Sequence, residues 1–279
     1  MDNPEFAKEV SDIIARNAGS RSLQEATALW MRESVAHRYS YCFRWLGRPI
    51  IQYPQDMVAM QELIWHVRPD LIVETGIAHG GSLVLSASML AMLDMCDAIS
   101  EQRTLDPSAS ARLVLGVDID IRAHNRTAIE AHPMASRIRM IQGSSIADDV
   151  VAQVRQVAKG FKRVLVCLDS NHTHNHVLAE LEAYAPLVTP GSYCVVFDTV
   201  IDEMPDGTYP NRPWGPTDNP KTAVRKFLKS HPEFEIDTAI HDKIQITVAR
   251  DGYLQRHPRA RHGGNETKPS TAESPPSDA

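Results

Sequence analysis

Short runs of β-branched and aliphatic residues alternate with helix-like segments through the middle of this chain, and this alternation restricts the possible folds most strongly. The runs are predicted strands at 70–75, 112–118, 137–142, 164–169 and 192–198. Predicted helices between them cover 82–97, 124–131, 145–158 and 174–187. Strands that are apolar on both faces and joined through helices form parallel sheets with helices on both sides. The sequence therefore predicts an α/β fold.

The segments on either side of this alternation predict further elements. Residues 4–38 have helical spacing with a break at Gly19 and Ser20, and Pro54 opens a helix that runs to about Val67. A helix is predicted over 220–230, followed by two strands at 234–239 and 243–249 that pair antiparallel. We expect a helical region (1–54) that covers the site or forms an oligomer contact, one α/β domain (55–254) with a seven-stranded, mostly parallel sheet, and a disordered Pro- and Ser-rich tail (255–279).

Composition and charge exclude several classes of protein. Lys and Arg total 29 against 35 Asp and Glu, and the net charge of -6 disfavours binding to nucleic acid. The four cysteines show no zinc-finger spacing, which fits a reducing compartment. The N-terminus lacks the pattern of a signal peptide, and the longest apolar segment, 83–95, is interrupted and short for a bilayer. We expect a cytoplasmic protein without a membrane partner, in a homo-oligomer.

A glycine-rich turn connects the first predicted strand to the helix that follows. Glu74 lies at the end of the strand, and Gly76, Gly80, Gly81 and Ser82 come after it. Glycines at such a turn let the backbone approach a ligand, which in parallel sheets binds at the carboxyl ends of the strands. The spacing loosely matches the NAD fingerprint, whereas a carboxylate such as Glu74 suits the ammonium group of S-adenosylmethionine. Because that carboxylate would repel a pyrophosphate, S-adenosylmethionine is favoured.

Acidic and small polar residues end the second and third predicted strands. Asp118 follows the second strand, where a carboxylate can accept hydrogen bonds from both ribose hydroxyls. Gly143, Ser144 and Ser145 follow the third strand and are placed to border an adenine ring. Because the carboxyl ends of parallel strands share one edge of a sheet, these residues are predicted to join the cofactor site.

The fourth and fifth predicted strands bring carboxylates to the same edge. Asp169 follows the fourth strand and is succeeded by Asn171, His172 and His174, while Asp198 ends the fifth. Two carboxylates with a nearby carboxamide can bind a hard divalent cation such as Mg²⁺. Such an ion would lower the pKa of a substrate hydroxyl. The catalytic candidates are Asp169, which could also contact the cofactor, and His172 or His174 as general base.

Three histidines within five residues allow other metals to be considered. His172 and His176 would share a face in a helix, but no cysteine or third spaced ligand accompanies them, so zinc is disfavoured. His172 and His174 with Asp169 leave a two-histidine, one-carboxylate iron site as a further alternative. We therefore keep the hard cation as the expectation.

Several motifs together resemble the cephalosporin hydroxylase family. They are PQDMVAMQELIW, DLIVETGIAHGGSL, LGVDIDIRAHNR, IQGSS, CLDSNHTHNHVLAEL and RPWGPTDNPKTAV, within residues 40–253. The resemblance implies a Rossmann-like class I methyltransferase that uses S-adenosylmethionine, with contacts at Glu74, Gly76, Asp118 and the turn 143–145. It also implies a magnesium site at Asp169 and the end of the fifth strand. There Phe197 replaces a carboxylate of the family pattern, which shifts one ligand role to Asn171, Asp202 or Glu203.

The acceptor is predicted to be a sugar hydroxyl in a glycoside, glycan or natural product. The loop 202–219, with Tyr209, Arg212 and Trp214, and the aromatic segment 39–45 are placed to form the walls of its site. Aromatic faces stack on sugar rings while polar groups bind the hydroxyls. The family resemblance also points to sugar O-methylation. An NAD-dependent oxidoreductase and a non-catalytic cofactor-binding protein on the same fold are the alternatives.

Overall fold

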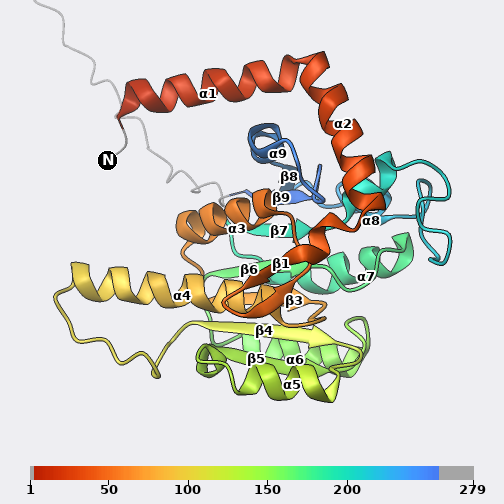
Figure 1. The fold of residues 1–279 in the computed structure, drawn as a ribbon. Coiled ribbons are helices and arrows are strands. Elements are labelled where there is room, and N and C mark those ends of the chain that lie inside the picture. Colours follow the sequence, from red (N-terminus) through yellow and green to blue (C-terminus); the bar gives the residue numbers. More distant parts are fainter. Residues whose placement is uncertain (1–2, 258–279) are drawn as a thin grey trace, which may run out of the picture.

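The computed structural model describes residues 3–257, which contain one seven-stranded sheet with the order β5-β4-β3-β6-β7-β9-β8 (Figure 1). Strands β3 to β7 pair in parallel, and β9 runs antiparallel to both of its neighbours. The strands are β3 (Leu71–Thr75), β4 (Leu113–Asp118), β5 (Ile138–Gln142), β6 (Val164–Leu168), β7 (Tyr193–Val196), β8 (Phe234–Ile236) and β9 (Tyr253–Arg256). A short hairpin of β1 (Phe43–Trp45) and β2 (Arg48–Ile50) forms a separate two-stranded sheet that packs against α4. The predicted fold class is confirmed.

Helices cover both faces of the sheet. Those of one face are α6 (Asp148–Ala158), α7 (His174–Tyr184) and α8 (Pro220–Phe227), which bury Val150, Leu181 and Val224. Those of the other are α3 (Pro54–Val67), α4 (Gly81–Ser100), α5 (Ala123–Glu130) and α9 (Thr238–Ile244). Every residue of β3 and β6 is buried, because these central strands pack against helices on both sides. This burial explains the continuous apolar runs in the sequence.

The predicted strand at 243–249 is wrong, because a helix and a loop occupy these residues. The Asp237 side chain accepts a hydrogen bond from the Ala239 amide at 3.2 Å and caps the start of α9. Ile240 and Ile244 are four residues apart, so they share one helical face and pack against the core. Residues 245–249 form a loop, in which Ile246 and Val248 pack against the core without joining the sheet.

The antiparallel strand is instead β9, close to the end of the described residues. Tyr253 and Leu254 are fully buried, and Leu254 pairs with Cys194 of β7 and Ile236 of β8. The strand ends at Arg256, so residues 255 and 256, predicted as part of a disordered tail, belong to the sheet. The remainder of that tail from residue 258 lies outside the described residues.

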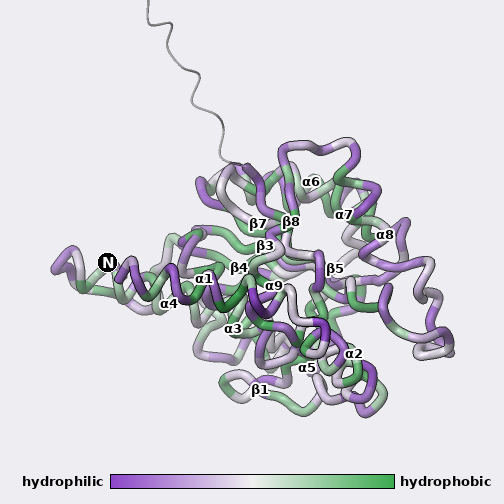
Figure 2. The backbone as a smooth tube through the Cα atoms, turned by 90° about the horizontal axis from the view of Figure 1, so that it is seen from above, coloured by the Kyte–Doolittle hydropathy of each residue, from purple (hydrophilic) through white to green (hydrophobic). Residues whose placement is uncertain are grey.

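Two helices precede the sheet and meet at the predicted break. They are α1 (Pro4–Gly19) and α2 (Arg21–Ala36), capped by the side chains of Asn3 and Ser20 respectively. No residue of α1 is buried, and hydrophilic and hydrophobic segments alternate along it (Figure 2). α2 instead buries Thr27, Met31 and Ser34 as it descends toward the carboxyl edge of the sheet (Figure 1).

The helix α4 has the length and hydropathy of a membrane span, the one such helix in residues 3–257. More than half of its most apolar segment, 56%, is buried inside the protein, where it packs beside α3 and β4. α4 is therefore the core helix that follows the glycine turn, and its apolar composition is explained by packing against the sheet.

Candidate functional site

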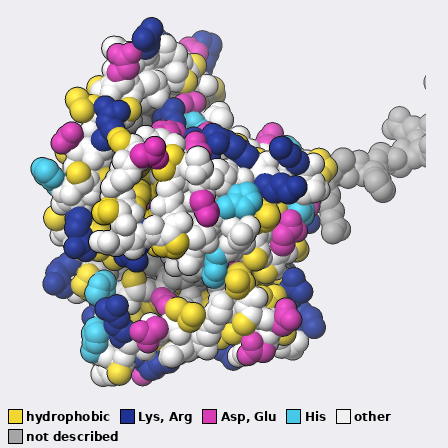
Figure 3. Space-filling model, turned by 90° about the vertical axis from the view of Figure 1, so that its right-hand side faces the viewer, with side chains coloured by type: hydrophobic (Ala, Val, Ile, Leu, Met, Phe, Trp, Pro, Cys, Tyr) yellow, Lys and Arg dark blue, Asp and Glu magenta, His cyan; other side chains and the backbone are white. Residues whose placement is uncertain are grey.

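A cavity of about 690 Å³ opens at the carboxyl edge of the sheet, where ligands bind in folds of this kind. Figure 3 looks onto this edge, where the surface is hollowed and histidine and acidic side chains lie beside the hollow. The walls include the glycine turn, the ends of β6 and β7, the end of α2 and the loop before α8. The positions of the predicted cofactor, metal and acceptor residues can therefore be described relative to this cavity.

The glycine turn is shaped by two close contacts. Gly76 has φ +90°, and a Cβ on it would lie 2.1 Å from the carbonyl oxygen of Asp169. A Cβ on Gly81 would lie 2.2 Å from the carbonyl oxygen of Pro49 in β2. Because only glycine fits either position, the turn from β3 lies tightly between the end of β6 and the hairpin. Gly76, Gly81 and Ser82 line the large cavity, while Gly80 is the N-cap residue of α4.

A smaller cavity of about 30 Å³ lies beside this turn. Glu74 lines it, and the Glu74 carboxylate accepts a hydrogen bond from the Ser86 hydroxyl. Burial raises the pKa of Glu74, although hydrogen bonds from Ser86 and Ser82 partly oppose the rise. A buried acidic group at this position fits the predicted recognition of an ammonium group.

Asp118 holds the glycine turn in place. Its carboxylate oxygen Oδ2 accepts hydrogen bonds from the Ile77 amide at 2.7 Å and the Ala78 amide at 3.2 Å. Asp118 is not among the residues that line either cavity. Its observed contacts fix the backbone of the turn, and its role toward a ribose remains a prediction.

The predicted adenine residues follow β5 and do not line the cavities, and Ser145 contacts α7 instead. Gly143 and Ser144 form the turn, and Ser145 is 4% exposed. The Ser145 hydroxyl lies 3.0 Å from the His176 Nε2 atom. Glu180, fully buried in α7, accepts a hydrogen bond from Ser170 at 2.6 Å. Glu180 was not predicted as a site residue, although it lies within the quoted motif CLDSNHTHNHVLAEL; its burial in α7 distinguishes it only in the structure.

Asp169, His172 and Asp198 come together at the ends of β6 and β7. One ligand atom from each lies within 4.8 Å of the others. The His172 Nε2 atom is 3.1 Å from the Asp198 Oδ2 atom. Burial, followed by the charges of Asp198 and Glu74, raises the pKa of Asp169 well above its ordinary value. Such repulsion indicates a place where a cation is stabilised, so the group fits a divalent ion.

Two predicted residues point away from this group. The Asn171 Oδ1 atom accepts hydrogen bonds from the amide and hydroxyl of Thr173, at 3.0 and 2.9 Å, which starts α7. His174 faces α8, with its Nδ1 atom 2.8 Å from the Thr222 hydroxyl oxygen. The structure therefore does not bring Asn171 into the metal group or His174 into the cavity, because the first turn of α7 uses both.

Two residues beside the carboxylates complete the floor of the site. Phe197 is buried in the core and lines the smaller cavity. Gln52, which was not predicted as a site residue, lines both cavities, and its Nε2 atom is 3.4 Å from the Asp169 Oδ2 atom. The Gln52 Oε1 atom is buried without a hydrogen-bond partner in the described part of the chain. It follows β2 in an irregular stretch, so no periodicity marks it.

Aromatic side chains form the outer wall, partly as predicted. Tyr209, Arg212 and Trp214 line the large cavity, as does Tyr41 of the segment 39–45. The Trp214 ring meets His172 edge-on, with 4.6 Å between ring centroids. The other aromatic residues of 39–45 pack inward instead and do not line the cavity.

Comparison with known proteins identifies the family. The sequence profile of the Rhamnosyl O-methyltransferase/CmcI family matches residues 37–257 of this chain. The chain belongs to this family. Rhamnosyl O-methyltransferase from Mycobacterium leprae is 27% identical over 214 residues, which are 76% of this chain and 82% of that protein. The enzyme of the same name from Mycobacterium tuberculosis is 27% identical over 204 residues, 72% of this chain and 73% of that protein.

Solved structures of CmcI have the same fold as this Rhamnosyl O-methyltransferase/CmcI family member. A structure of CmcI with Mg and SAM is 17% identical, with a TM-score of 0.51 and coverage of 77% of each chain. An apo structure of CmcI is also 17% identical, with a TM-score of 0.50 over 78% of this chain and 77% of that chain. These likenesses confirm the class I methyltransferase architecture.

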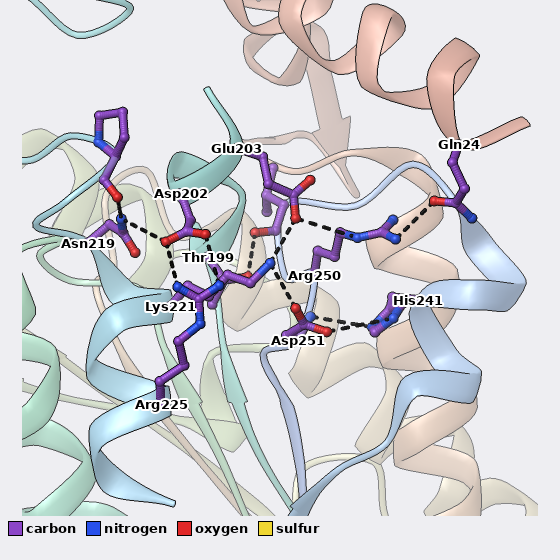
Figure 4. Close-up of polar contacts among 12 residues, drawn as sticks. Gln24, Thr199, Asp202, Glu203, Asn219, Lys221, Arg225, His241, Arg250 and Asp251 are labelled. Carbon is purple, nitrogen blue, oxygen red and sulfur yellow. Dashed lines mark hydrogen bonds and ion pairs between the residues drawn. The ribbon is translucent and has the colours of Figure 1, made fainter. Parts of the chain in front are cut away.

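In this family member, an ion-pair network around the buried Lys221 supports the turn after β7 (Figure 4). The Lys221 ammonium of α8 lies 2.8 Å from Glu203 and 2.7 Å from Asp251. The Arg250 guanidinium contacts Glu203 at 3.5 Å and donates to the Gln24 side chain of α2 at 2.9 Å. Because Glu203 ends the 3-10 helix η4 (Thr199–Glu203) that begins after β7, the network connects the carboxylate end of the site to α2.

Proposed function

We propose that this protein transfers the methyl group of S-adenosylmethionine to a hydroxyl of a sugar, with the help of a divalent cation. Family membership supports methyl transfer, and the rhamnosyl O-methyltransferases among its relatives support a sugar acceptor. One observation carries the assignment of the site. A single cavity joins the glycine turn at Gly76 to Asp169, His172 and Asp198. Cofactor and acceptor can therefore meet within it.

The cofactor is bound at the glycine turn. Gly76 and Ser82 line both cavities, and Glu74 provides a carboxylate beneath them for the ammonium group of the methionine portion. The alternative, an NAD-dependent oxidoreductase, requires a pyrophosphate at this turn. Glu74, Asp169 and Asp198 all lie at this end of the sheet and would repel it. The positive sulfonium of S-adenosylmethionine instead gains from the same field.

In the reaction, the acceptor oxygen forms a bond to the methyl carbon while the bond from carbon to sulfur breaks. The hydroxyl must lose its proton, and the group of Asp169, His172 and Asp198 is placed to assist. A divalent ion at the two carboxylates would lower the pKa of a hydroxyl bound to it. The His172 Nε2 atom faces both carboxylates and can either accept the proton or act as a further ligand.

The acceptor enters between the end of α2 and the loop before α8. Tyr41, Tyr209 and Trp214 present aromatic groups there, and Arg212 lies with its guanidinium carbon 5.2 Å from the Trp214 ring centroid. Apolar sugar faces pack on aromatic rings, and the sugar hydroxyls find polar partners among the cavity residues. A sugar of a glycoside, glycan or natural product fits this wall.

The N-terminal helical region contributes to this site as a lid. Val35, Ala36 and Arg38 at the end of α2 line the large cavity. α1 extends away with Phe6 61% and Ile13 38% exposed, which favours a contact with a second copy of the chain. A cytoplasmic homo-oligomer is consistent with these features.

Two experiments test the proposed function. Calorimetric titration with S-adenosylhomocysteine and with NAD compares the two cofactor classes, and we expect binding of the first alone. Incubating cell extracts with radiolabelled S-adenosylmethionine, then identifying the product by mass spectrometry, should yield a labelled glycoside. A labelled phenol or protein would contradict the sugar assignment. Binding of the nucleoside without turnover of any acceptor would support the alternative of a non-catalytic protein.

A further inference from the structure

We propose that His172 is the third protein ligand of the divalent cation, and that its nitrogen makes this site bind first-row transition ions more tightly than Mg²⁺. The inference deepens the proposed function and rests on it only for what the ion does. In this proposal His172 is a metal ligand and not the general base. The site predicted from the sequence has only oxygen ligands, and the imidazole nitrogen of His172 is the added one.

The geometry supports three ligands from two strand ends. Asp169 and Asp198 follow adjacent parallel strands, so their carboxylates meet across one gap. His172 reaches the same gap from the turn before α7, and one ligand atom of each residue lies within 4.8 Å of the others. Two ligand atoms that each lie about 2.0–2.2 Å from one transition ion are at most about 4.4 Å apart. The His172 Nε2 and Asp198 Oδ2 atoms, 3.1 Å apart, meet this limit, and a shift of about 0.4 Å or less brings the Asp169 carboxylate within it.

The neighbouring residues leave His172 as the available third ligand. Phe197 precedes Asp198 but packs its ring into the core. Asn171 uses its carbonyl oxygen for the Thr173 hydrogen bonds that start α7. The His172 ring is instead held from one side by Trp214, edge-on, with its Nε2 atom directed to Asp198. This packing restricts the rotation of the imidazole ring and keeps its Nε2 atom beside Asp198.

A second, independent observation indicates a ligand at this place. Gln52 is 7% exposed, lines both cavities and has a buried Oε1 atom without a partner in residues 3–257. Its Nε2 atom is only 3.4 Å from the Asp169 Oδ2 atom. A buried polar atom without a partner is uncommon and costs free energy. An ion with its bound water would offer that oxygen a donor.

The chemistry of the ligands determines which ion binds best. Mg²⁺ prefers oxygen ligands and near-ideal octahedral geometry, whereas an imidazole nitrogen suits transition ions such as Fe²⁺, Ni²⁺ and Zn²⁺. Mn²⁺ also prefers oxygen ligands and is the weakest binder of the first-row series, so it gives the most stringent comparison with Mg²⁺. Two carboxylates balance the charge of a divalent ion, and neutral His172 adds a donor without adding charge. Mg²⁺ can occupy the site, but Mn²⁺ and Co²⁺ should bind about tenfold more tightly or better.

The first test needs no variant. Metal-free protein is titrated with Mn²⁺ and with Mg²⁺ by calorimetry, without cofactor or acceptor, and the Mn²⁺ complex is studied by pulsed electron paramagnetic resonance. We expect tighter binding of Mn²⁺ and a ¹⁴N coupling from a directly bound imidazole. Equal affinities without ¹⁴N coupling would overturn the proposal.

Two matched variants assign the nitrogen. His172→Gln keeps a polar side chain but removes the imidazole, so the ¹⁴N coupling should vanish and the Mn²⁺ affinity should fall about tenfold or more. His174→Gln changes a histidine two residues away that faces Thr222, and should alter neither. Coupling that persists in His172→Gln refutes the assignment.

S-adenosylhomocysteine binding shows that each variant is folded. Correct metal binding without methyl transfer would refute the proposed function and leave this inference standing.

Discussion

Carboxylates at the two edges of the sheet have opposite surroundings. At the amino edge, where β4 and β5 begin, Asp94 contacts the guanidinium groups of Arg112 and Arg137. At the carboxyl edge, where β6 and β7 end, Asp169 and Asp198 lie together without a cationic partner from Lys or Arg in the described chain. The acidic group at the amino edge is therefore neutralised by arginines, whereas the acidic group at the carboxyl edge has no positive side chain to neutralise it.

The pKa values of the two edges diverge accordingly. Burial opposes ionisation of Asp94, but hydrogen bonds from Ser110, Arg137 and Arg112 outweigh it and hold the pKa below its ordinary value. Burial also acts on Asp169, and there the nearby charge of Asp198 adds to it, so the pKa is raised. The paired carboxylate of Asp94 at the amino edge therefore stabilises the fold. The unpaired carboxylates of Asp169 and Asp198 at the carboxyl edge instead favour the binding of a positively charged ligand.

The largest expected effect comes from removing the charge of Asp94 at the amino edge. Asp94→Asn should lower the free energy of unfolding by about 3–5 kcal/mol, because it leaves the buried Arg112 and Arg137 side chains without their shared charge. Urea unfolding monitored by circular dichroism measures this change. Cofactor binding by the remaining folded protein should be retained. A loss below about 1 kcal/mol would show that the cluster is solvated and that the two edges do not differ as described.

The matched change at the carboxyl edge should affect activity instead of stability. Asp169→Asn should reduce methyl transfer about 100- to 1,000-fold, since it removes a charge that stabilises the reacting groups. Its thermal unfolding temperature should stay the same or rise, because repulsion with Asp198 is relieved. Activity assays and calorimetric melting measure the two effects. Destabilisation as large as that of Asp94→Asn would contradict the comparison.

A third carboxyl group near the site provides a pH test. Burial raises the pKa of Asp56 to about 6, although hydrogen bonds from Thr247, Val248 and Tyr253 partly oppose the rise. An acid with a raised pKa favours folding most when protonated. Its contribution is fully present below about pH 4, the ordinary value, and is lost as the pH rises through about 6. The loss amounts to about 3 kcal/mol.

Asp56→Asn removes this titration while keeping the contacts. The amide oxygen can accept from the Val248 amide, and the NH₂ group can donate to the Thr247 and Tyr253 hydroxyls that bond the other carboxylate oxygen. Unfolding free energies of both proteins are compared from pH 4 to 7. The variant should gain stability relative to wild type as the pH rises. A constant difference would show that Asp56 titrates normally.

The smallest expected effect concerns the aromatic wall. Trp214→Leu removes the ring that meets His172 edge-on, a contact of about 1 kcal/mol. The KM for the acceptor should rise about tenfold or less, while unfolding stability changes little because Trp214 is half-buried in a loop. Steady-state kinetics measure the change. An unchanged KM would remove Trp214 from the acceptor site.

Local patterns predicted the architecture well. The break between α1 and α2, the start of α3 at Pro54 and the strands β3 to β7 all lie within a few residues of their expected positions. These elements could be predicted because their periodicity and caps lie within the segment itself. The strand at the end of the chain was mislocated, because β9 is defined by its pairing with β7 and β8 and not by its own pattern.

The sequence by itself determined the sheet, the glycine turn and the carboxylates at the strand ends, because strand order places such residues on one edge. Only the tertiary structure decided which of three adjacent histidines faces the cavity. α7 begins at His174, so its first turn directs His174 toward α8 and His176 toward Ser145. His172 remains before the helix, beside Asp198. Contacts between residues distant in sequence, which no local pattern encodes, fix that choice.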